Sequence, residues 1–92
     1  MDNNVVLKCA PLRFYTQTDE DHCFAWIKKI KPIDIVEGIG QELRFIMKSN
    51  KISNQDLLEL IGLFRRYHFD LKQLKIFMND DNKIIFKSLG NL

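Results

Sequence analysis

Residues 53–67 read SNQDLLELIGLFRRY, and this stretch decides the fold class. Its large apolar residues recur at the three- and four-residue spacing that is typical of a helix. Ser53 and Asp56 form a pair similar to a capping box, with aspartate in place of the usual glutamate. Leu58 and Leu63 widen the apolar stripe, which indicates a helix covered on more than one side. We therefore expect residues 54–67 to form the central helix of the core.

A β-hairpin is expected before this helix. Residues 33–37 and 42–48 resemble strands, and the glycine-containing segment 38–41 joins them. The second arm alternates between two faces, with Leu43, Phe45 and Met47 on one and Arg44, Ile46 and Lys48 on the other. This alternation predicts that one face of the hairpin packs on the helix.

The remaining elements are shorter. Residues 5–7 and 12–16 have the composition of one or two short strands. A helix is expected over 19–30, begun by Thr18 and the acidic residues that follow it and ended by Pro32. Asp70 and Gln73 repeat the capping pattern before a third helix over 71–78, for which a strand is the competing interpretation. Residues 83–87 are expected to form a terminal strand or a helical end.

Together these elements predict an α+β fold, with a small, mainly antiparallel sheet packed against a central helix and two shorter helices. At 92 residues the chain is expected to be a single domain, 1–92. The residues expected in the core are Trp26, Ile27, Ile30, Leu43, Phe45, Leu57, Leu60, Ile61, Phe64, Leu71, Leu74 and Phe77.

Composition limits the function classes. The formal net charge is +2, which by itself predicts neither a nucleic-acid-binding protein nor an acidic decoy. The first residues have no positive segment followed by an apolar one, and no apolar run approaches the roughly 20 residues of a membrane span. We therefore expect a cytoplasmic protein that makes no membrane contact, with Cys9 and Cys23 as free, structural thiols.

No catalytic, cofactor or metal motif is recognisable. Cys9, Cys23, His22 and His68 lack the tight spacing of a metal site, and the segment 38–40 lacks the third glycine of a phosphate loop. Spacing alone leaves a nucleophilic pair of Cys23 with His68 open. We expect a protein without catalytic activity, cofactor or metal.

Acidic residues gather at three places, and one of these patches is the candidate partner-binding surface. If the hairpin pairs as expected, its three carboxylates lie near one end of the sheet. Such a patch suits docking on a basic partner, although solubility and helix capping are the competing explanation. The candidate residues are Asp19, Glu20, Asp21, Asp34, Glu37, Glu42, Asp80 and Asp81.

Basic residues near aromatic ones suggest an alternative, a small nucleic-acid-binding or regulatory module. Arg65 and Arg66 precede Tyr67 and His68, and Lys28 and Lys29 end the first helix. The competing interpretation is that these are solvated charges in the last turns of two ordinary helices. The near-neutral net charge makes nucleic acid the less favoured partner.

Five segments carry a resemblance to a known family: WIKKI (26–30), EGIG (37–40), ISNQDLLELI (52–61), LFRRY (63–67) and DLKQL (70–74). Over residues 24–86 the chain resembles small bacterial immunity proteins encoded beside toxins of contact-dependent growth inhibition. The resemblance implies a stoichiometric inhibitor that binds one toxin C-terminal domain, often a nuclease, in the cytoplasm and blocks its active site or its access to substrate. It does not extend to the first 23 residues, and it carries over no contact residue, because these interfaces differ from pair to pair.

Overall fold

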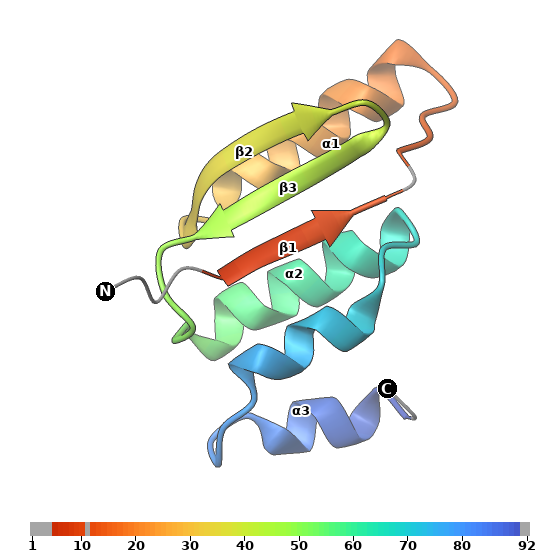
Figure 1. Cartoon of the computed structure of the whole chain (residues 1–92). Coiled ribbons are helices and arrows are strands. Elements are labelled where there is room, and N and C mark those ends of the chain that lie inside the picture. The colour runs from red at the N-terminus through yellow and green to blue at the C-terminus, as the bar shows by residue number, and fades with distance from the viewer. Residues whose placement is uncertain (1–4, 11, 91–92) are drawn as a thin grey trace.

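The structure is a computed structural model that describes residues 5–10 and 12–90. Three strands, β1 (Val5–Cys9), β2 (Ile33–Ile39) and β3 (Glu42–Met47), form an antiparallel sheet in the order β1-β3-β2 (Figure 1). The N-terminal segment thus pairs within the sheet, where β1 lies against β3. The expected α+β fold is confirmed.

The hairpin is tighter than expected. Strand β2 continues to Ile39, so only Gly40 and Gln41 connect it to β3. Gly40 has a φ of +61°, a left-handed conformation that glycine adopts without steric cost. The expected alternation in β3 is confirmed, because Leu43, Phe45 and Met47 are all buried.

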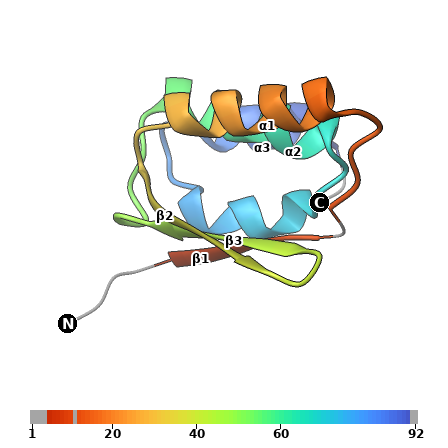
Figure 2. The same ribbon diagram turned by 90° about the horizontal axis from the view of Figure 1, so that it is seen from above.

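Helices α1 (Gln17–Lys29), α2 (Asn54–Arg66) and α3 (Lys83–Ser88) all lie on the same side of the sheet (Figure 2). Helix α2 begins as expected, since the Ser53 hydroxyl accepts a hydrogen bond from the Asp56 backbone N–H at 3.1 Å. Its buried side chains make it the centre of the core, and they are Leu57, Leu60, Ile61, Leu63 and Phe64.

Helices α1 and α2 run antiparallel to each other. Trp26 Nε1 donates a hydrogen bond to Glu59 Oε1 at 2.9 Å, and near the other end Arg66 Nη2 lies 3.4 Å from Asp19 Oδ1. Gly62 faces Trp26, and a Cβ atom at this glycine would lie 3.1 Å from Trp26 Cζ2. The glycine inside α2 is therefore explained by the close approach of an indole ring.

Of the one or two strands expected near the N-terminus, β1 is present, and the structure differs from expectation at the start of α1 and at residues 12–16. Helix α1 begins at Gln17 with Thr16 as its N-cap, two residues earlier than expected, because the Thr16 hydroxyl accepts from the Asp19 backbone N–H at 3.1 Å. Residues 12–16 form no strand. This segment crosses from the sheet to the helices, and Phe14 packs its ring edge-on against Tyr67 with 5.9 Å between ring centroids.

The C-terminal part contains two helical elements joined by a turn. Residues Leu71–Phe77 form a 3₁₀ helix, η1, so the competing strand is wrong; so is a terminal strand over 83–87, where α3 forms the helical end. The turn between them is held by Asn82, a fully buried side chain whose Nδ2 donates to the Phe77 carbonyl at 2.8 Å. Asn is a strong turn former because its side chain replaces backbone partners in this way.

The expected core residues are buried except Trp26 and Leu71, which are partly buried and pack against the core, and the core also contains residues that were not expected, among them Leu7 and Phe69. Trp26 is only partly buried, and its indole N–H donates to the partly buried Glu59, as the polar end of a tryptophan usually finds a partner. Within the described part of the chain, no helix is long and apolar enough to cross a membrane.

Candidate binding surfaces

One face of the sheet is left uncovered by the helices (Figure 2). Val6 and Ile35 both pair with Ile46 in the register, so these three side chains form an apolar row across all three strands. Val6 is 48% exposed and Ile35 49%, and Ile39, at the turn end of β2 on the same face, is 50% exposed. These exposures are large for branched aliphatic residues, whose burial stabilises a fold.

A charged row lies beside the apolar one. Arg44 on the central strand pairs with Lys8 on one side and Glu37 on the other, and its Nε lies 2.7 Å from Glu42 Oε2. We call the whole surface the open face, and its residues are Val6, Lys8, Ile35, Glu37, Ile39, Glu42, Arg44 and Ile46. Two of the candidate carboxylates, Glu37 and Glu42, therefore lie on it.

Asp34 lies at the opposite end of β2, so the expectation that three hairpin carboxylates gather at one end of the sheet is wrong. Ile33 pairs with Met47 and Ile35 with Ile46, which leaves Asp34 as the extra residue of a bulge. Asp34 lies near the start of β2, whereas Glu37 and Glu42 lie near the hairpin turn at the other end of the strand. Near Asp34 the exposed side chains are basic ones, and a hollow of about 380 Å³ there includes Lys28, Lys31 and Lys48.

The acidic residues of α1 are engaged within the protein. Asp19 Oδ1 pairs with Arg66, Oδ2 accepts from the Tyr15 backbone N–H at 3.3 Å, and the side chain is only 11% exposed. The Gln17 amide donates to both Glu20 and Asp21 at 2.9 Å. Asp19 thus joins two segments of this chain, which leaves little of its carboxylate to a partner.

Asp80 and Asp81 lie in the turn before α3, the element farthest from β2 in Figure 1. Asp80 is almost fully exposed and lies 3.6 Å from Lys83 Nζ, a contact that solvent weakens. The eight candidate carboxylates therefore do not form one patch.

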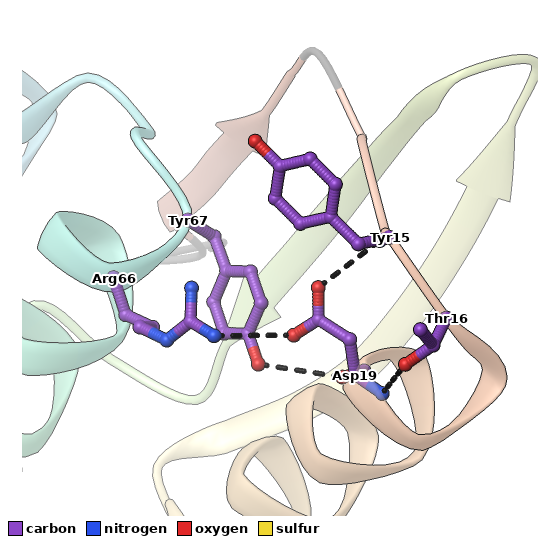
Figure 3. Close-up of polar contacts among 5 residues, drawn as sticks. All are labelled: Tyr15, Thr16, Asp19, Arg66 and Tyr67. Carbon is purple, nitrogen blue, oxygen red and sulfur yellow. Dashed lines mark hydrogen bonds and ion pairs between the residues drawn. The ribbon is translucent and has the colours of Figure 1, made fainter.

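A second surface lies where the N-terminus of α1 meets the C-terminus of α2 (Figure 3). A hollow of about 290 Å³ opens there, and its lining residues are Arg13, Tyr15, Asp19, Arg66, Tyr67 and His68. We call it the arginine hollow. Arg66 and His68 were recognised in the sequence as basic residues near aromatic ones, whereas Arg13 and Tyr15 were hidden in the expected strand.

Lys28 and Lys29 do not join this hollow. They end α1, and because α1 and α2 are antiparallel, that end lies away from the α2 C-terminus that carries Arg65 and Arg66. The four basic residues grouped for nucleic-acid binding therefore belong to two separate surfaces.

Both cysteines are free and fully buried. Burial raises the pKa of the Cys23 thiol from 9.0 to about 11, and the nearby Asp19 carboxylate adds to the shift. Burial also raises the pKa of the Cys9 thiol. A nucleophilic cysteine needs the opposite shift, toward the thiolate. Within residues 5–10 and 12–90, no three His, Cys, Asp or Glu side chains are grouped so that they could hold a metal ion.

In comparisons with known proteins, no family model matches this chain, and neither a curated protein nor a solved structure matches it.

Proposed function

We propose that this protein is an immunity protein, which binds a cognate contact-dependent growth-inhibition toxin one to one and neutralises it. The open face of the sheet is the observation that carries the proposal, together with the family resemblance of residues 24–86. Apolar residues that lie contiguously on a surface are typical of protein–protein interfaces.

The open face has the composition of such an interface. Its apolar part is the row of Val6, Ile46 and Ile35 at one end of the sheet, and the charged row of Lys8, Arg44 and Glu37 borders it on the side of the hairpin turn. Interfaces commonly combine an apolar centre, which excludes water, with a polar rim. Burying half-exposed aliphatic side chains against a partner contributes about 25 cal/mol per Å² of apolar surface.

The open face carries two carboxylates beside Lys8 and Arg44, and Glu37, which has no ion pair among the described residues, is the one free to meet a toxin of the nuclease class. A nuclease needs a basic surface to bind the phosphates of its substrate. Glu37 pairs with Arg44 in the strand register across the hairpin and Glu42 precedes Arg44 on β3, so both carboxylates lie on the hairpin side of the open face. Opposite charges across an interface direct association and raise its rate.

Co-expression tests the proposal directly. The toxin C-terminal domain encoded next to this gene is induced in cells with or without the protein, and survival and co-purification are measured. We expect survival and a one-to-one complex. Cell death despite abundant folded protein, with no complex, contradicts the proposed function.

Matched variants test the surface. Ile35→Lys adds charge to the open face, whereas Ile84→Lys makes the same change at a residue of α3 that is 73% exposed. We expect Ile35→Lys to lose protection and Ile84→Lys to keep it, with both variants equally folded by circular dichroism. Full protection by Ile35→Lys would move the interface away from the open face.

A further inference from the structure

We propose that the arginine hollow binds a nucleoside monophosphate group, with its phosphate between Arg13 and Arg66 and its base against the ring of Tyr15. The ligand is a free mononucleotide or the phosphorylated end of a single strand. The proposal does not depend on the proposed immunity function, because the hollow shares no residue with the open face.

Arg66 is held in position for a ligand. Its Nη2 lies 3.4 Å from Asp19 Oδ1, and its guanidinium carbon lies 5.1 Å from the centre of the Tyr67 ring (Figure 3). Its Nε and Nη1 have no acceptor among the described residues, and its side chain is 57% exposed. A guanidinium fixed on one side and free on the other is suited to a phosphate, which accepts two parallel N–H bonds.

The carboxylate in the hollow orients Arg66 and does little to repel an anion. Both Asp19 oxygens already accept from this chain, one from Arg66 and the other from the Tyr15 backbone N–H. Arg13 is exposed and has no ion pair among the described residues. Two guanidiniums against one engaged carboxylate leave a net positive charge, and the His68 ring adds a further N–H donor.

Tyr15 supplies the aromatic surface. Its side chain is 92% exposed, and its ring makes no contact with another ring among the described residues. The backbone N–H of the same residue donates to Asp19, which holds this segment at the hollow, and the exposed Tyr15 ring lines the hollow together with Arg66 (Figure 3). Stacking of one base on an exposed aromatic ring contributes about 1–3 kcal/mol.

The size of the hollow selects a small ligand. Its volume of about 290 Å³ is just below the roughly 300–1,000 Å³ of typical small-molecule sites. A single nucleotide matches this size, whereas a duplex needs a long basic surface along its backbone. The Lys28 and Lys29 end of α1 does not continue the hollow, which also favours one nucleotide over a duplex.

The test is titration of the whole protein with uridine monophosphate, uridine and inorganic phosphate, followed by calorimetry and by amide NMR shifts. We expect saturable binding of the monophosphate, with shifts around Tyr15 and His68. Uridine and phosphate alone should each bind at least about tenfold more weakly, because each lacks one of the two contacts. A 5′-phosphorylated hexauridylate is the second arm: tighter binding than the mononucleotide identifies a strand end, and equal binding identifies the free nucleotide.

Variants locate the site. Arg66→Gln and Tyr15→Ala should each weaken binding at least about tenfold. Arg65→Gln is the control, since it removes the same charge from the same helix outside the hollow. Tyr15→Phe should retain binding because the ring remains. Three results would overturn the proposal: no saturable binding at millimolar ligand, equal loss in Arg65→Gln, or phosphate binding as tightly as the nucleotide.

Discussion

The side-chain amide of Gln73 makes with the backbone of Lys8 the two hydrogen bonds that a neighbouring strand would make. Gln73 Oε1 accepts from the Lys8 N–H at 2.6 Å, and Gln73 Nε2 donates to the Lys8 carbonyl at 2.7 Å. Helix η1 thereby covers part of the outer edge of β1. A sheet edge left open pairs readily with other chains, and covering it opposes aggregation.

Gln73→Ala should therefore lower the free energy of unfolding by about 1–3 kcal/mol, the contribution of two net hydrogen bonds. Urea denaturation measures the change. Gln55→Ala is the matched control, because Gln55 is exposed on α2 and makes one long contact of 3.4 Å with Glu59. Equal stability of the two variants would mean that the strand-like contact contributes nothing.

Because Gly62 lies against Trp26, the effect of a Gly62→Ala substitution on stability should depend on whether Trp26 is present. Alanine inside a helix is normally about 1 kcal/mol more stable than glycine. Here we expect Gly62→Ala to destabilise the protein, because its Cβ would lie 3.1 Å from an indole ring anchored on Glu59. In a Trp26→Phe background, where that part of the ring is absent, the same change should stabilise. Thermal unfolding of the four proteins decides it, and stabilisation in both backgrounds contradicts the steric account.

His68 has a φ of +62° and occupies the position after the α2 C-cap where glycine is usual. The Phe69 N–H bonds to the Phe64 carbonyl at 2.8 Å, which completes this helix-ending motif. His68→Gly should raise the free energy of unfolding by about 1 kcal/mol, since glycine adopts this conformation without strain. His22→Gly inside α1 should lower it by about the same amount. Chemical denaturation of the two variants measures both changes. A loss of stability in His68→Gly would contradict the view that the positive φ of His68 is strained.

The buried thiols predict a decline of stability in alkali. The folded pKa of Cys23 is raised from 9.0 to about 11, so above pH 9 the unfolded chain loses its proton first. Stability is complete below pH 9 and falls by about 1 kcal/mol per pH unit toward pH 11. Cys9, whose pKa is also raised, acts in the same direction. Unfolding free energies from pH 8 to 11 test this.

The control is the Cys9→Ala, Cys23→Ala double variant, which should show a shallower decline over the same range. In the native protein at pH 8 both thiols should react with iodoacetamide only as fast as the protein unfolds. Rapid alkylation of the folded state would contradict their burial.

The central helix and the hairpin could be predicted from the sequence because their signals are local. Ser53 and Asp56, which cap α2, are only three residues apart. The alternation of Leu43, Phe45 and Met47 is visible within one strand, because one face of that strand is buried. The start of α1 was predicted two residues late because threonine can cap a helix at either position, 16 or 18. The contacts of Asp19 with neighbouring segments are consistent with Thr16 as the cap.

The surfaces could be predicted only in part. Glu37 and Glu42 were recognised as candidates, but the bulge at Asp34 leaves no sequence signal. Arg13 and Tyr15 meet Arg66 across more than fifty residues of sequence, a contact that depends on the antiparallel packing of α1 and α2. Gln73 resembled a capping residue, and its partner is 65 residues away in β1.

The one-sided sheet separates what holds the protein together from what it presents to others. Strands β1 and β3 contribute buried side chains to the core at every second position, namely Val5, Leu7, Cys9, Leu43, Phe45 and Met47. The positions between them lie on the open face and can change without altering that core. A lineage with this fold can therefore exchange the residues that it presents to a partner while its core stays the same. Relatives would then diverge fastest at the strand positions whose side chains lie on the open face.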